Sequence, residues 1–533
     1  MPAVRFEKRF LLLAISVLEM LLFSGIIYGW TSLVYILKQE GYFSDHCETT
    51  SANTTQQNTQ VIKLVNCQVI TNTSTQDAPC YPACLEQDET LTQVFAISVV
   101  ASQVASLFAG IALDYFGLRF IRTCFSVMMA TAALLLGFST REYPYVYLVY
   151  PGMILVGMCA NITLLANVTV GNLFGSRRST VITIITGSFG SSPVTFLVQK
   201  MLYVHFGVPF QHMCFALACL SVPSLLATFT LFPKRKFLPN SHQEKRKDSQ
   251  ETEKLQKENK SGAGVESGTA RPNEETFVQV VTSRLYLLHL AYMSVMNLNV
   301  IILVGTANIW FNMVTGNNNG HVSFWTDVFG FFQVSNVLVS PLCGFVYDLG
   351  LRGHAYRGPT MTSRRRAAVP VFIITSLTSS LVFFFATLSV WDTSSVESST
   401  GLLMTSAPDM LLTFVLHVVS RAFIYGGNTA FIANSFPAKH LGRLIGMSYL
   451  VAGLLGLLQY PLIGWIKAAG SPFYVYIFVL VLSVVTFGHP IYISYHCRDV
   501  SGKDGRHPSQ SSLGNPVNGH LKHEACDSKE TCV

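Results

Sequence analysis

The stretch Gly110-Ile-Ala-Leu-Asp114-Tyr-Phe-Gly117-Leu-Arg119 recurs in the second half of the chain as Gly344-Phe-Val-Tyr-Asp348-Leu-Gly350-Leu-Arg352. Each copy directly follows a long apolar segment and keeps the order acid, glycine, arginine, although the second copy is one residue shorter between its acid and the next glycine. A signature that recurs at matching turns indicates an internal duplication, with a tight turn and a charge latch in each half. The side chains expected to form this conformational latch are Asp114, Arg119, Asp348 and Arg352.

The composition places most of the chain in lipid. Of its 533 residues, 50% are hydrophobic and only 12% are charged, and the mean hydropathy is +0.40, whereas soluble domains carry about 25% charged residues. The net charge of +7 is concentrated in particular loops, which indicates membrane topology and argues against a nucleic-acid partner. The sequence contains no phosphate-binding P-loop, zinc-ligand cluster or serine nucleophile motif, so we expect neither an enzyme nor a resident cofactor or metal.

Twelve apolar stretches are long enough to cross the roughly 30 Å of hydrocarbon in a lipid bilayer. Together with the duplicated turn, they predict an all-α polytopic membrane protein, a twelve-helix bundle of two six-helix halves. The predicted organisation is an N-terminus at 1–9, a first half at 10–232 with an extracellular loop at 38–89, a linker at 233–284, a second half at 285–495 and a disordered tail at 496–533.

Basic residues fall in every second loop, as is expected of cytoplasmic loops. This pattern predicts that the N-terminus, the linker and the tail are all cytoplasmic. The basic groups are Arg119 with Arg122, Arg177 with Arg178, Lys234 to Lys236, Arg364 to Arg366, and Lys439 with Arg443.

The predicted extracellular loop is rich in cysteine, which indicates an oxidising compartment. It also carries glycosylation sequons at Asn53 and Asn72, so we expect a glycoprotein of the plasma membrane. The predicted disulfide cysteines are Cys47, Cys67, Cys80 and Cys84, for which three pairings are open.

The chain ends in Thr531-Cys532-Val533. A terminal Thr-x-Val with a free carboxylate fits strand addition to the groove of a PDZ-type protein. The alternative is a chance ending of a loose tail.

A second repeated pair supports the duplication, since Asn172-Leu-Phe-Gly-Ser-Arg-Arg and Asn434-Ser-Phe-Pro-Ala-Lys-His follow apolar stretches at matching places. Two related sets of six helices place a site for a small-molecule substrate near the bilayer midplane between the halves. Access would then alternate as one half rocks against the other.

Two ionisable residues, Glu19 and Arg421, lie within apolar stretches, where charge is costly. Either each contacts the substrate, Glu19 through a substrate N–H or a coupling proton and Arg421 through an acceptor, or each pairs within the protein to hold helices together. Residues that share a helical face with one of them are Phe23, Trp30, Tyr425 and Asn428.

Neutral polar residues within the stretches add weaker candidates, because amides also join helices. Asn167 and Asn428 occupy nearly corresponding positions in the two halves, and Asn297 lies in the seventh stretch. The predicted substrate-binding residues are Glu19, Phe23, Trp30, Asn167, Asn297, Arg421, Tyr425 and Asn428.

The repeated turns resemble the loop signature of the major facilitator superfamily, and further motifs resemble solute carrier family 43 within it. Gly29-Trp-Thr-Ser-Leu-Val34 is similar to both the nucleobase and the large neutral amino acid branches of that family. The runs Ser420-Arg-Ala-Phe-Ile-Tyr-Gly-Gly-Asn428 and Asn167-Val-Thr-Val-Gly-Asn-Leu-Phe-Gly175 resemble the nucleobase branch. The outer loop, linker and tail depart from the family pattern.

The resemblance implies a sodium-independent uniporter of purine nucleobases such as adenine, guanine and hypoxanthine. Aromatic faces and amides suit such a flat, uncharged heterocycle. A uniporter of large neutral amino acids is the alternative, because Glu19 and Arg421 supply the opposite charges that a zwitterion needs. A non-transporting membrane scaffold or receptor is a third interpretation.

Overall fold

The computed structural model describes residues 6–45, 85–235, 237, 276–315, 319–353, 361–395 and 402–496. The predicted disulfide cysteines, both predicted glycosylation sites and the C-terminal motif lie outside these residues. Every regular element in the described part of the chain is a helix.

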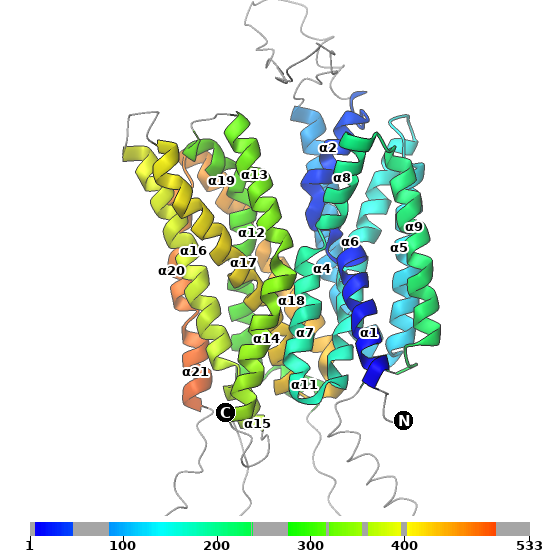
Figure 1. The fold of residues 1–533 in the computed structure, drawn as a ribbon. Helices are drawn as coiled ribbons and strands as arrows, with labels where there is room; N and C mark the ends of the chain where they lie inside the picture. The colour runs from blue at the N-terminus through cyan, green and yellow to red at the C-terminus, as the bar shows by residue number, and fades with distance from the viewer. Residues whose placement is uncertain are drawn as a thin grey trace, which may run out of the picture.

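The first half of the bundle is built from helices that lie along one common direction, with α2 continuing α1 and α8 continuing α7 (Figure 1). They are α1 (Phe6–Glu19), α2 (Trp30–Gln39), α4 (Leu85–Tyr115), α5 (Leu118–Phe138), α6 (Val149–Val168), α7 (Arg178–Ser191), α8 (Val194–Phe206) and α9 (Phe210–Thr230).

The second half stands beside the first (Figure 1). Its helices are α11 (Phe277–Val281), α12 (Arg284–Val314), α13 (Asn319–Val334), α14 (Asn336–Gly353), α15 (Met361–Arg366), α16 (Val369–Ser395), α17 (Leu402–Ser435), α18 (Leu441–Gly456), α19 (Gln459–Ala469), α20 (Phe473–Val485) and α21 (Gly488–His496).

The predicted fold class is confirmed. Among the described residues, 10 helices are long and apolar enough to cross a membrane, or up to 12 if each of two bent pairs is one span. The bent pairs are α1 with α2, which meet at 46°, and α13 with α14, which meet at 42°. Helix α1 begins and α21 ends at the same end of the bundle (Figure 1).

The bend between α1 and α2 fits against a second break, between α7 and α8. A π-helical turn (η1, Met20–Ser24) and a 3-10 turn (η2, Ile26–Gly29) flank Gly25. A Cβ on Gly25 would lie 2.6 Å from both the Phe189 carbonyl oxygen and Ser192 Oγ, so only glycine lets the two broken helices approach this closely. The Thr195 hydroxyl donates to the Leu21 carbonyl at 3.0 Å, which satisfies a backbone group near the break.

The two halves meet where α4 lies against α18 and where α7 lies against α14 and α17. The first glycine of each duplicated stretch makes this packing close. A Cβ on Gly110 would lie 2.2 Å from the Gly442 carbonyl oxygen, and one on Gly344 would lie 2.3 Å from the Thr180 Cα. The repeated signature therefore forms the contact between the halves, at the end of the bundle where α4 and α14 end, which we name the latch end.

Candidate functional site

At the latch end, Asp114 binds the beginning of a helix in the opposite half. Its carboxylate accepts hydrogen bonds from the backbone N–H groups of Gly442 at 3.2 Å and Arg443 at 3.0 Å. It also forms an ion pair with the Arg443 side chain at 3.3 Å. These are the first N–H groups of α18, where helical donors lack partners and the helix dipole favours negative charge.

Asp348 makes the equivalent contact in the other direction. Its carboxylate accepts from the backbone N–H groups of Ser179 at 3.2 Å and Thr180 at 3.0 Å, at the beginning of α7, and from the Thr180 hydroxyl at 2.7 Å. Each acid of the duplicated stretch thus joins its own half to the other half. Both acids lie at this junction. We therefore propose Asp114 and Asp348 as the latch residues.

The two arginines of the signature lie elsewhere. Arg119 donates to the carbonyl oxygens of Phe229 at 3.2 Å and Phe232 at 2.8 Å, so it ties α5 to the end of α9 within one half. Arg352 is exposed. The cation that pairs with Asp114 is Arg443 of the opposite half rather than the arginine of its own signature.

Replacing both acids, Asp114→Ala with Asp348→Ala, is expected to open the latch end. Each acid supplies charge-assisted hydrogen bonds, which are worth about 1.5–3 kcal/mol each, so the closed arrangement should lose much of its population. Ser106 is fully buried between α4 and α18, and the measurement is the rate at which a thiol reagent labels a cysteine introduced there. We expect labelling at least ~10-fold faster, with no change for Asp327→Ala, which removes an exposed carboxylate on α13. Unchanged labelling in the double variant would show that the acids do not hold this end shut.

Inside the first half, a buried ion pair joins α1 to α5. Arg122 Nη2 donates to Glu19 Oε1 at 2.5 Å, and Arg122 Nη1 donates to the Asn167 amide oxygen at 2.5 Å. The Ser224 hydroxyl donates to Glu19 at 2.7 Å, and the Asn167 amide donates to its second oxygen at 3.2 Å. The guanidinium lies 3.5 Å from the centroid of the Phe232 ring. The charge of Glu19 is therefore matched by Arg122. This agrees with the second interpretation of Glu19, in which it pairs within the protein to hold helices together.

Arg122 lies inside a helix and not in the cytoplasmic loop that the pattern of basic residues predicted for it. It is only 1% exposed, because it lies one turn inside α5, which begins at Leu118. Charge spacing alone does not distinguish a loop residue from one in the first turns of a helix.

The second half contains a related cluster with histidines in place of the ion pair. The amide oxygen of Asn428, at a position corresponding to Asn167, accepts a hydrogen bond from the His289 imidazole Nε2 at 3.0 Å. The rings of His289 and His489 lie 5.2 Å apart. The hydrogen bonds of Asn167 and Asn428 among the described residues are each made within their own half.

Two predicted aromatic residues also pack within the first half. Phe23 packs edge to face on Phe125 at 5.9 Å between ring centroids, and Trp30 stacks on Phe95 at 5.7 Å. Trp30 remains partly exposed at the beginning of α2.

A second polar group, centred on Arg421, gathers three of the predicted residues. Arg421 Nη1 donates to the Gln333 amide oxygen. The Tyr425 hydroxyl donates to the Asn297 amide oxygen at 2.9 Å, and the Asn297 amide donates to the Ala452 carbonyl at 3.1 Å. We name Arg421, Gln333, Tyr425, Asn297 and Tyr28 the Arg421 group.

Tyr28 brings the first half into this group. It lies on the turn η2 and interacts electrostatically with Arg421 on α17 of the other half. Tyr28 is 36% exposed although it lies in the middle of a span. The Arg421 group therefore lies between the halves.

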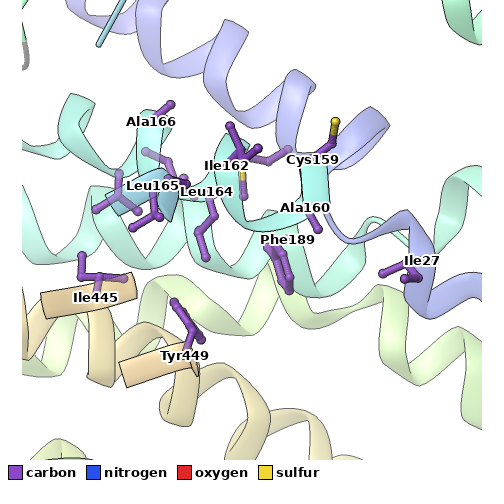
Figure 2. Close-up of a cluster of buried hydrophobic side chains, with 14 of the residues drawn as sticks. Ile27, Cys159, Ala160, Ile162, Leu164, Leu165, Ala166, Phe189, Ile445 and Tyr449 are labelled. Atoms are coloured by element: carbon purple, nitrogen blue, oxygen red, sulfur yellow. The ribbon is translucent and has the colours of Figure 1, made fainter. Parts of the chain in front are cut away.

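Aromatic faces surround the group. Tyr28 packs edge to face on Phe189 at 5.9 Å, and Tyr425 stacks with Tyr449 at 6.4 Å and 29°. Figure 2 shows Phe189 and Tyr449 beside Leu164 and other apolar side chains of a buried cluster that includes residues of both halves. Aromatic rings of both halves therefore lie in or beside the Arg421 group.

Arg421 has donors to spare. Its Nε is buried and has no hydrogen-bond partner, and among the described residues no carboxylate forms an ion pair with it. A buried guanidinium without a counter-charge is costly. Its free edge, Nε with Nη2, presents two parallel N–H groups that suit a ligand with two adjacent acceptors.

Tyr28 was not among the predicted residues, because the helical face that contains Glu19 was predicted on the assumption that the first span is one continuous helix. The π-helical and 3-10 turns at Met20–Ser24 and Ile26–Gly29 change the residues per turn. Extrapolation from Glu19 then reaches Trp30, whereas Tyr28 is the residue of this span that interacts electrostatically with Arg421. Phe189 and Tyr449 carried no distinguishing signal in the sequence, since aromatic residues are common in membrane helices. Gln333 was visible only as one of several amides within the apolar stretches, which also join helices.

Two related bundles that meet around a buried polar group, with breaks in the helices at that level, define a secondary transporter. The sequence profile of the Major Facilitator Superfamily matches residues 85–408, and the chain belongs to this superfamily. It is accordingly a multi-pass membrane transporter and not an enzyme.

The chain is also similar to individual proteins along most of its length. It is 27% identical over 510 residues to Equilibrative nucleobase transporter 1 of Bos taurus, covering 91% of this chain and 96% of that protein. It is 26% identical over 556 residues to Large neutral amino acids transporter small subunit 3 of Homo sapiens, covering 92% and 94%. These relatives bear out the resemblance to solute carrier family 43.

The fold is shared with a solved transporter. The proton:xylose symporter XylE aligns with a TM-score of 0.58 and 11% sequence identity, covering 93% of this chain and 97% of that one. At this identity the likeness concerns the fold alone, and it agrees with the bundle of two halves.

Proposed function

We propose that this protein is a facilitative, sodium-independent transporter that carries purine nucleobases such as adenine, guanine and hypoxanthine across the plasma membrane by alternating access. The observation that carries the proposal is the Arg421 group, in which the buried guanidinium Nε has no hydrogen-bond partner and aromatic rings from both halves lie close by. The similarity to a nucleobase transporter over 91% of the chain supports it.

A purine nucleobase matches the chemistry of this group. Its flat ring system stacks on aromatic side chains, and its ring nitrogens and exocyclic groups need a few donors and acceptors at the edge. Tyr28 and Tyr425 supply ring faces, and Arg421 supplies the donors. The base carries no net charge, so it requires no acidic partner.

The burial of Glu19 and its pairing with Arg122 argue against a zwitterionic substrate. An amino acid needs an acceptor for its ammonium group as well as a cation for its carboxylate. Glu19 was the acid available for that role, and it is 4% exposed and bound by Arg122, Asn167 and Ser224. No other carboxylate contacts the Arg421 group among the described residues.

Large neutral amino acids remain the second candidate. The free edge of Arg421 also fits a carboxylate, and the human relative at 26% identity is named for such amino acids. The ammonium group would then rest on the tyrosine faces of the Arg421 group through cation–π contacts.

Charge placement suggests how the bundle sits in the membrane. The latch end holds Arg443 and Arg178, and the positive-inside rule assigns an end of this kind to the cytoplasm. We therefore propose that both termini are cytoplasmic and that the latch closes the cytoplasmic side of the site.

Uptake of labelled adenine and labelled leucine by cells that express the chain tests the proposal. We expect adenine uptake above that of non-expressing cells, unchanged when choline replaces sodium, and no leucine uptake. A pH gradient of one unit should not drive accumulation of adenine above its external concentration, because Glu19 is committed to Arg122. Leucine uptake without adenine uptake would establish the second candidate, uptake of neither would favour a scaffold or receptor, and concentrative uptake driven by protons would contradict a uniporter.

A further inference from the structure

Within the proposed function, we propose that Gln333 is a specificity residue. Arg421 alone suffices to hold 6-oxopurines such as hypoxanthine, whereas 6-aminopurines such as adenine require the Gln333 amide oxygen as well. The inference rests on the proposed function and concerns which purines the same site accepts.

The amide of Gln333 is fixed between two side chains of α17. Its oxygen accepts from Arg421 Nη1, and its nitrogen lies 3.2 Å from the Nε2 of His417, one turn before Arg421. The two contacts orient the amide with its oxygen toward the guanidinium. Gln333 lies near the end of α13 and is only partly buried, so a ligand can reach it.

The two side chains together form one edge with mixed hydrogen-bonding capacity. The Nε of Arg421 has no partner and donates. The amide oxygen of Gln333 has two lone pairs, of which Arg421 occupies one. Around the rim of the guanidinium, the donors Nε and Nη2 therefore lie on one edge, and the Gln333 acceptor lies beyond Nη2, at Nη1.

The purine classes differ at the atoms that would meet this edge. A 6-oxopurine presents two acceptors side by side, O6 and N7, which a guanidinium fork binds in bidentate fashion. A 6-aminopurine presents the N7 acceptor beside an N6–H donor, which calls for one donor and one acceptor. Arg421 donates to N7 in both cases, but only Gln333 accepts from the amino group.

Two substitutions at Gln333 should shift the preference in opposite directions. In Gln333→Met the acceptor is lost, and the ratio of adenine to hypoxanthine uptake should fall by ~10-fold or more, since one correctly paired base edge discriminates by about 1–3 kcal/mol. In Gln333→Glu the carboxylate still accepts from N6–H but repels O6, so the ratio should rise. Gln459→Met, on α19, is the control and should leave the ratio unchanged.

The ratio is measured with both labelled bases on the same cells, normalised to the protein at the cell surface. Opposite shifts in the two variants support the inference, because neither poor folding nor a loosened Arg421 changes the ratio in two directions. A ratio that stays constant, or that moves the same way in both variants, would show that Gln333 only supports Arg421. If the unmodified protein transports neither base, it is the proposed function that fails.

Discussion

Substitution of Glu19 by leucine is expected to remove most of the folded transporter from the membrane. It leaves the guanidinium of Arg122, which is 1% exposed, without its counter-charge, and breaking a buried ion pair in this way costs about 3–5 kcal/mol. The free energy of unfolding of most proteins is only about 5–15 kcal/mol, so this cost is a large part of the total stability. The measurement is the amount of protein at the cell surface, together with the midpoint of thermal unfolding in detergent.

A double variant separates this structural role from a role in transport. With Glu19→Leu and Arg122→Leu together, no unpaired charge remains, and a large part of the lost stability should return. If Glu19 serves only to hold α1 against α5, the recovered protein should also transport. Glu7→Leu, an exposed position on the same helix, is the control. Full surface expression of the single variant Glu19→Leu would contradict a buried, paired carboxylate.

The repeated signature of the sequence predicted the duplication and a charge latch in each half, and the structure places the signature where the halves meet. Gly110 with Asp114 and Gly344 with Asp348 lie at equivalent places, because each glycine lets a helix of the other half approach and each acid binds that helix at its beginning. The pairing of Asp114 with Arg443 could not be predicted from the sequence. It depends on how the halves dock, and single-sequence patterns report local geometry only.

For the buried residues too, the sequence predicted what depends on local helical geometry and did not predict what depends on packing between helices. Arg421 and Tyr425 were predicted together from helical spacing, and α17 is a helix over Leu402–Ser435 that keeps them one turn apart. Asn428, predicted on the same face, instead bonds His289 and Ser448 inside its own half. In the first span the same reasoning crossed a break at Gly25 and chose Trp30 over Tyr28. Spacing is informative only as long as the helix is regular, and the packing that breaks a helix comes from its neighbours.

Replacement of Arg421 by lysine is expected to reduce nucleobase uptake by ~100-fold, although the positive charge is kept. Lysine presents a point charge on a flexible stem, whereas the planar guanidinium binds Gln333 and still offers a fixed pair of donors. Losing two charge-assisted hydrogen bonds, at about 1.5–3 kcal/mol each, accounts for a loss of this size. Initial rates of adenine and hypoxanthine uptake, normalised to surface protein, measure it.

Two further measurements show what Arg421 recognises. One is nucleobase uptake by the variant Arg421→Ala, and the other is leucine uptake by the variant Arg421→Lys. Arg421→Ala should abolish uptake, and Arg141→Lys, at an exposed position between α5 and α6, should leave it unchanged. A carboxylate ligand tolerates lysine far better than a base edge does, because a point charge suffices to neutralise it. Leucine uptake that survives Arg421→Lys would therefore favour the amino acid candidate, while nucleobase uptake that survives the same change would show that the guanidinium edge does not hold the substrate.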